Sequence, residues 1–193
     1  MKPKMYPWRI GGLNTGQLFI DFANSEWYDG RGNVADRLQD PTWRRAFLRE
    51  CGLKRYEPLE EADLPELIEV RSAIRSIAER VRASRAPARR DLELLKAVLT
   101  DHPMRFQLSR RGAQLELEMV PVEQPPKGLA GEIALSAARF LAGGQLDRLK
   151  MCDNPGCRWM FLDRTKNRTR RWCGPCGNID KVRRFRERHR MGP

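Results

Sequence analysis

Four of the five cysteines lie in one short segment, and their spacing constrains the fold more than any other feature of the chain. Cys152 and Cys157 form a C-x4-C pair, fifteen residues follow, and Cys173 and Cys176 form a C-x2-C pair. Two close pairs joined by a connector of this length are typical of a chain that surrounds a tetrahedral zinc ion. Asn-Pro-Gly and Gly-Pro stretches between the cysteines supply the turns that this requires. We therefore predict one structural zinc ion per chain, bound by all four thiolates.

The second pair taken alone allows another interpretation. Residues 172–176 read WCGPC, which is also the active-site motif of thioredoxins. That fold needs the motif at a strand-to-helix junction early in a domain, with most of its sheet still to follow. Only 17 residues follow Cys176 in this sequence, and they are rich in arginine. The context therefore favours zinc binding over thiol–disulfide exchange.

The positive charge is concentrated in the last quarter of the sequence. Residues 148–193 contain 14 Lys and Arg against 4 Asp and Glu, so they carry +10 of the total net charge of +12. Such asymmetry indicates a nearly neutral body with a basic module for an anionic partner. We expect nucleic acid, and DNA in the first place, because arginine outnumbers lysine and its planar fork suits phosphates and guanine edges. The alternative is a zinc-stabilised adaptor that binds the acidic surface of another protein.

The cations expected to contact nucleic acid fall in the connector between the cysteine pairs and in a helix predicted from Ile179 to His189. They are Arg164, Lys166, Arg168, Arg170, Arg171, Lys181, Arg183, Arg184 and Arg188. Asn178 is expected to cap the helix N-terminus. Val182, Phe185 and His189 share one face at steps of three and four, and we expect them to pack back onto the zinc lobe.

The rest of the chain predicts an α+β domain that is mostly helical. The clearest helix is 64–82, where apolar residues recur at steps of three and four. Further helices are predicted over 36–49, interrupted near Pro41, and over 88–99 and 129–141. Residues 17–24 are predicted to form a short strand, and the alternation in 104–108 and 115–119 predicts a β-hairpin. The predicted organisation is an α+β domain over 1–145 and, over 146–193, a zinc lobe of treble-clef or zinc-ribbon type that ends in a basic helix.

Several functional classes are disfavoured. No apolar run is long enough to cross a bilayer, and the start of the sequence has no apolar leader, so we expect no membrane association. An odd number of cysteines without an export signal favours the reducing cytoplasm. The sequence has no nucleophile elbow, phosphate-binding glycine loop or two-histidine metal motif, so we do not expect an enzyme.

Two segments resemble a known family. RLKMCDNPGCRWMFLDRTKNRTRRWCGPCGN, from Arg148 to Asn178, resembles the CGNR-type zinc finger of bacterial proteins, although Ile179 replaces the arginine that gives the motif its last letter. GGLNTGQLFIDFAN, from Gly11 to Asn24, resembles the signature of the ABATE domain that precedes this finger. The family is described as regulators of transcription under stress. The resemblance therefore implies a zinc-binding regulator.

Asp21 and Asn24 are two polar residues near the end of the ABATE-like signature. The simpler interpretation is that Asn24 caps a turn while Asp21 pairs with an arginine. The alternative, suggested by the family resemblance, is that both form the floor of a pocket for a small-molecule effector. The sequence leaves homo-oligomer formation open.

Overall fold

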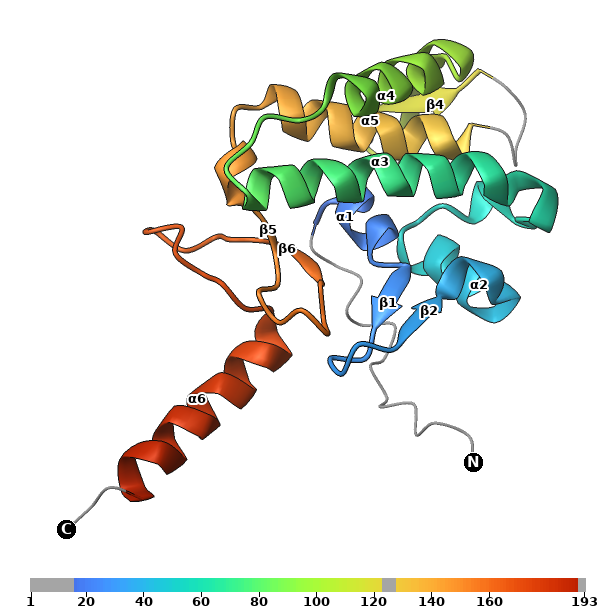
Figure 1. Ribbon diagram of the computed structural model, residues 1–193. Coiled ribbons are helices and arrows are strands. Elements are labelled where there is room, and N and C mark those ends of the chain that lie inside the picture. Colours follow the sequence, from blue (N-terminus) through green and yellow to red (C-terminus); the bar gives the residue numbers. More distant parts are fainter. Residues whose placement is uncertain (1–15, 123–127, 191–193) are drawn as a thin grey trace.

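The computed structural model describes residues 16–122 and 128–190, and helices dominate these segments (Figure 1). The helices are α1 (Leu18–Ala23), α2 (Pro41–Glu50), α3 (Leu64–Arg82), α4 (Arg89–Asp101), α5 (Leu129–Ala142) and α6 (Gly174–Arg190). The strands form three antiparallel pairs: β1 (Glu26–Tyr28) with β2 (Val34–Asp36), β3 (Met104–Arg111) with β4 (Gln114–Pro121), and β5 (Leu149–Met151) with β6 (Met160–Leu162). This confirms the predicted α+β fold with a terminal zinc lobe.

The core forms around α3, whose bounds match the predicted helix. Figure 1 shows α3, α4 and α5 side by side, and α1 contacts both α3 and α5. The face of α3 that carries Leu67, Val70, Ile74 and Ile77 is buried. Apolar residues at steps of three and four form a single stripe on a helix, and here this stripe is the buried face. The period in the sequence therefore predicted both the helix and the face that it buries.

The β5–β6 pair belongs to this same core, although it lies within the segment that carries the cysteines. Leu149, Met151 and Met160 are at most 2% exposed and join the hydrophobic cluster of the body. β5 packs against α3, and β6 contacts α1. The zinc lobe is therefore attached to the body through buried side chains.

Within residues 17–24, Leu18–Ala23 form helix α1, so the predicted strand is wrong. Phe19, Ile20, Phe22 and Ala23 are all buried, because the segment lies between α3 and α5. A short segment that is buried on nearly every side, here with Asp21 as its one charged residue, shows no apolar period. Its composition therefore does not separate a short helix from a buried strand. Pro41 likewise begins α2 and does not interrupt it. Proline suits the first turn of a helix, where its missing N–H is not needed.

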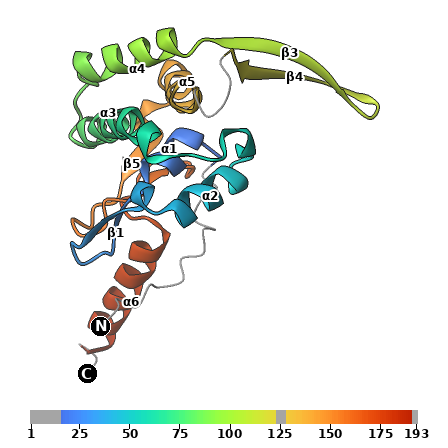
Figure 2. The same cartoon turned by 90° about the vertical axis from the view of Figure 1, so that its right-hand side faces the viewer.

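The predicted β3–β4 hairpin is present and extends well away from the helices (Figure 2). Its strands pair in register from Met104 opposite Pro121 to Arg111 opposite Gln114. Among the described residues, no helix is long and apolar enough to cross a membrane.

Candidate metal centre and basic surface

The four clustered cysteines come from two turns that the fold brings together. Cys152 and Cys157 lie in the loop between β5 and β6, while Cys173 precedes α6 and Cys176 lies in its first turn. The four Sγ atoms lie within 4.8 Å of one another, and the Sγ atoms of Cys157 and Cys173 are 3.7 Å apart. Zn–S bonds of about 2.3 Å in a tetrahedron place sulfur atoms about 3.8 Å apart. The cluster therefore fits one tetrahedral zinc ion in a treble-clef-like arrangement.

Two hydrogen bonds are donated to sulfur atoms of the cluster. The backbone N–H of Cys173 donates to Sγ of Cys152 over 3.5 Å, and Nδ2 of Asn154 donates to Sγ of Cys176 over 3.4 Å. Hydrogen bonds from the Cys157 and Cys173 thiols, together with the N–H of Cys173, lower the pKa of Cys152, and the same hydrogen bonds to Cys152 raise the pKa of Cys157 and Cys173. Donors of this kind orient the ligands and stabilise the deprotonated form that binds metal. Four thiolates fill a tetrahedral shell, so the ion has a structural role.

Asp163, which the sequence analysis missed, organises the connector between the two cysteine pairs. Its buried carboxylate accepts hydrogen bonds from the backbone N–H groups of Thr165 and Arg170, at 2.9 and 2.7 Å, and from the Thr165 hydroxyl. Burial raises the pKa of Asp163, but these hydrogen bonds lower it by more, so the net pKa lies below its usual range. The Asp-x-Thr pattern directly after an apolar strand was the available signal for this turn.

The metal centre is also tied to the body by direct contacts. The side chain of Asn24 donates to the backbone carbonyl of Met160 and accepts from its N–H, both over 2.9 Å. The N–H of Gly30, in the β1–β2 turn, donates to the carbonyl of Gly156 over 2.8 Å. Asn24 therefore connects α1 to β6 as a buried structural residue. Both polar atoms of the Asn24 side chain are bonded to Met160. The effector pocket expected at Asp21 and Asn24 stays a prediction.

Helix α6 departs from the sequence prediction in two ways. It begins at Gly174, so Asn178 lies inside the helix and is not its N-cap. It leaves the metal centre and points away from the body (Figure 1), so the expected packing of its apolar face onto the zinc lobe is wrong. Val182 is 48% exposed and Phe185 is 55% exposed. The ring of His189 contacts Phe185 on the helix itself, with centroids 4.0 Å apart.

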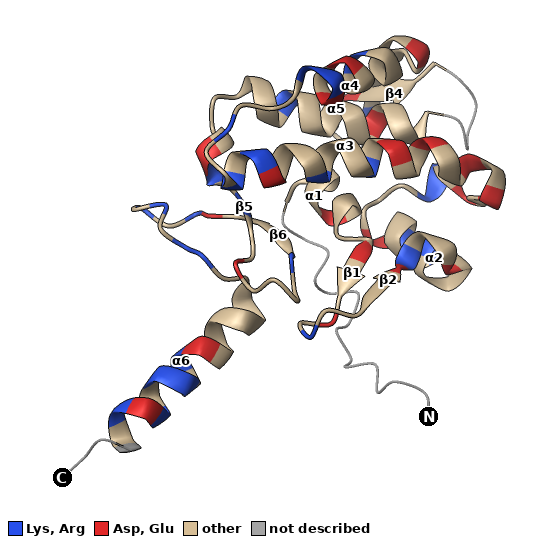
Figure 3. Ribbon diagram, viewed as in Figure 1, with Lys and Arg blue, Asp and Glu red and all other residues tan. Residues whose placement is uncertain are grey.

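The connector and α6 both present cations, and some of these are paired (Figure 3). On α6, Asp180 accepts from both Arg183 and Arg184 over 2.7 Å. In the connector, Arg168 pairs with Asp147 and Arg171 with Asp153. Arg170 lies over the ring of Phe161, 4.7 Å from its centroid. Three other predicted cations, Lys166, Lys181 and Arg188, are exposed and form no ion pair within the described chain.

The structure adds a basic cleft that the sequence analysis missed. It has a volume of about 720 Å³ and lies between the C-terminal end of α3 and the connector. Its basic lining residues are Arg82, Arg85, Lys150, Arg168, Arg170 and Arg171. The sequence signal for this cleft was the segment 80–90, which contains five arginines in eleven residues. Acidic residues elsewhere in the body offset this segment when charge is summed over the whole domain.

Two family models match the chain, one up to residue 144 and one from residue 148, which includes β5. The ABATE model, described as "Putative stress-induced transcription regulator", matches residues 16–144, and the CGNR zinc finger model matches residues 148–189. The chain belongs to the ABATE family. No curated protein matches it. The first description names a regulator and the second a zinc finger, and neither names an enzyme. The finger match together with the cysteine geometry establishes a site for one structural zinc ion.

This ABATE protein differs from the finger motif at one exposed position. Ile179, which stands in place of the motif's arginine, lies on α6 and is 69% exposed. It lies three residues before Val182, so an apolar stripe on α6 begins here. The helix therefore presents both cations and apolar side chains to solvent.

Proposed function

We propose that this ABATE protein is a transcription regulator that binds nucleic acid, and DNA in the first place, through its zinc-centred basic surface. This surface comprises the connector, α6 and the basic cleft. Residues 146–193 would form the binding module, and residues 1–145 the domain that receives a signal, with a small molecule as the expected effector. The protein would act in the cytoplasm, where its cysteines stay reduced.

The observation that carries this proposal is that one metal centre positions both cationic segments. Cys157 lies directly before the connector, Cys173 lies directly after it, and Cys176 lies in the first turn of α6. The ion would therefore hold the two segments in a fixed relation. A fixed array of cations can match the regular spacing of phosphates and release their counterions.

The shape of α6 is compatible with a groove of duplex DNA. Its 17 residues span about 25 Å, and an α-helix fits the major groove, which is about 12 Å wide. Lys181 and Arg188 are exposed on this helix and have no carboxylate partner among residues 16–122 and 128–190. The paired Arg183 and Arg184 would contribute less, because binding a phosphate requires that they leave Asp180.

A second candidate function is the protein adaptor, and the apolar stripe of α6 favours it. Ile179, Val182 and Phe185 are between 48% and 69% exposed. An amphipathic helix with apolar anchors at such steps can bind in a groove of a partner protein. The two functions differ in their dependence on salt, because contacts with phosphates release counterions and apolar contacts do not.

The test is a titration of zinc-loaded protein against random-sequence duplex DNA and RNA over a range of salt concentrations. The variant Lys181→Gln/Arg188→Gln should weaken binding to all sequences and reduce the salt slope by about 0.9 for each lost contact with duplex DNA, or about 0.7 on a single strand. The control, Lys54→Gln/Arg105→Gln, removes the same charge from exposed positions of the body. Binding without salt dependence, or equal losses in both variants, would favour the adaptor.

A further inference from the structure

The β3–β4 hairpin has two chemically different faces. Alternate residues of a strand point to opposite sides, and the register places Phe106 opposite Met119 and Leu108 opposite Leu117. One face therefore carries Met104, Phe106, Leu108, Leu115, Leu117 and Met119, with Arg110 opposite Leu115 near the tip. The other face carries Arg105, Gln107, Ser109, Glu116 and Glu118. Such separation is the pattern of a ribbon that buries one side.

The described chain leaves the outer part of this apolar face uncovered. Phe106 and Leu115 are each 71% exposed, and Leu108 and Leu117 are each 67% exposed. Figure 2 shows the hairpin extending past the helices into solvent. A two-stranded ribbon is only marginally stable unless its apolar face packs against something. We therefore expect another protein surface to pack against this face.

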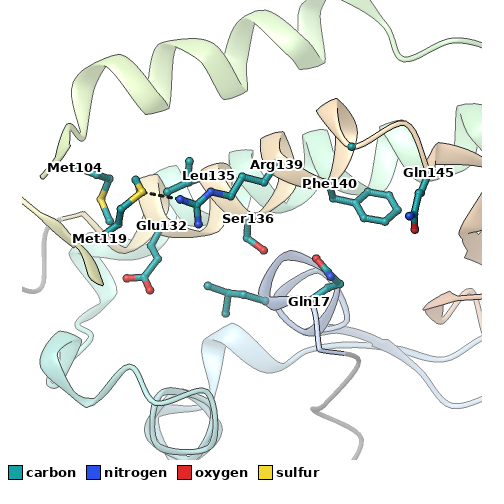
Figure 4. Close-up of a pocket in the computed structure, with 11 residues that line it drawn as sticks. Gln17, Met104, Met119, Glu132, Leu135, Ser136, Arg139, Phe140 and Gln145 are labelled. Carbon is teal, nitrogen blue, oxygen red and sulfur yellow. Dashed lines mark hydrogen bonds between the residues drawn. The ribbon is translucent and has the colours of Figure 1, made fainter. Parts of the chain in front are cut away.

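The inner end of the same face is anchored to the body (Figure 4). Met104 and Met119 line a cavity of about 540 Å³ together with residues of α5 and the start of α1. Arg139 of α5 donates a hydrogen bond to Sδ of Met119. This contact fixes the root of the hairpin, so the exposed part is presented in a defined direction.

We propose that this face stacks on the same face of a second copy, which makes the protein a homodimer. Four large apolar side chains at these exposures offer on the order of 500 Å² per copy. Two copies would bury about 1,000 Å², which is the lower limit of a specific interface. A two-fold contact is self-complementary, so the identical face of a second copy is a matching cover.

The distribution of charge favours a second copy at this position. Each chain carries a net charge of +12, so two copies repel one another over most of their surfaces. The hairpin and α6 point in different directions from the body (Figures 2 and 3). The eight-residue strands extend about 27 Å, which is several Debye lengths at physiological salt. Contact through the hairpins therefore keeps the basic modules apart and accessible.

Stacking of the faces explains the hairpin better than pairing of its edges. Pairing β4 with β4 of a second copy would bring Glu116 and Glu118 close to the same residues. It would also leave both apolar faces in solvent. Face-to-face packing, with sheets about 10 Å apart, buries them.

The test is the mass of the zinc-loaded full chain in solution, measured by sedimentation equilibrium over a concentration series without nucleic acid. The wild-type protein should show twice the chain mass of 22.4 kDa. The variant Leu108→Lys/Leu117→Lys should weaken self-association by at least about a hundredfold. The matched control is Gln107→Lys/Glu118→Lys, a neighbouring cross-strand pair on the opposite face, which should remain dimeric.

A monomeric wild-type protein at every concentration would overturn the proposal and leave the face to a different partner. The same holds if the face variant stays dimeric, or if the control dissociates as readily. Should circular dichroism show that the lysine variant is unfolded, Leu108→Thr/Leu117→Thr decides, because threonine suits a strand while removing most of the apolar contact. This measurement does not depend on nucleic-acid binding, so it can fail independently of the proposed function.

Discussion

Replacing Asn24 with alanine should detach β6 from α1 and destabilise the whole protein. The amide of Asn24 satisfies both the N–H and the carbonyl of Met160, and Asn24 is only 1% exposed. Alanine removes the hydrogen-bond partners of the Met160 N–H and of the Met160 carbonyl at once. Water has no direct access to the site, so the two backbone groups of Met160 would stay buried without hydrogen bonds.

The expected cost follows from these two groups. Leaving one buried polar group unsatisfied costs about 1–3 kcal/mol, so two such groups cost about 2–6 kcal/mol. We expect a loss of about 3 kcal/mol in the free energy of unfolding, in the lower half of this range. For a protein of this size, 1 kcal/mol shifts Tm by about 2–4 °C, so Tm should fall by roughly 6–12 °C.

The assay is thermal and denaturant unfolding of zinc-saturated protein, with Asn33→Ala as the matched control. Asn33 is exposed, and its side-chain amide donates to Oδ2 of Asp29. Its backbone N–H, which alanine keeps, donates to Oδ1 of the same residue. The control should lose less than about 1 kcal/mol. If Asn24→Ala is no less stable than Asn33→Ala, the two hydrogen bonds do not hold the lobe to the body.

Three further changes probe the metal centre. Gly156→Ala should lower the free energy of unfolding by about 1–3 kcal/mol, because the added Cβ would lie 2.7 Å from a backbone oxygen of the β1–β2 turn. The control Gly174→Ala, whose added Cβ has its nearest contact at 3.9 Å, should be neutral in the same unfolding assay. Cys173→Ser should lower the zinc content well below one ion per chain in elemental analysis, while Cys51→Ser should retain it; equal zinc in both would contradict the assigned ligands. Asp163→Asn should lower Tm at neutral pH. The difference from wild type should shrink as the pH falls below about 4, because the hydrogen bonds that lower the folded-state pKa of Asp163 stabilise only its ionised carboxylate. A difference that is constant with pH would rule out that carboxylate as the cause.

The zinc ligands and α3 could be predicted because their signals are local. Two cysteine pairs specify a metal centre through chain spacing, and the helical period of α3 specifies its buried face. The direction of α6 could not be predicted in this way. The steps from Val182 to Phe185 show that they share a face, but they do not show whether another part of the chain covers it. The basic cleft was missed for a related reason, since Arg85 and Lys150 meet only in the folded protein.

The metal centre changes how the charge of its own segment should be counted. Four thiolates and one divalent ion together carry −2, so residues 148–193 present about +8 to a partner when zinc is bound, and not the +10 of the side-chain count. When acid releases the ion and protonates the thiols, that −2 disappears and the segment becomes more cationic although its geometry is lost. Weak, salt-sensitive attachment of metal-free protein to nucleic acid would therefore report the charge of the segment alone. Restoring zinc lowers the net positive charge of the segment. Nucleic-acid binding that nevertheless becomes stronger would therefore come from the folded surface.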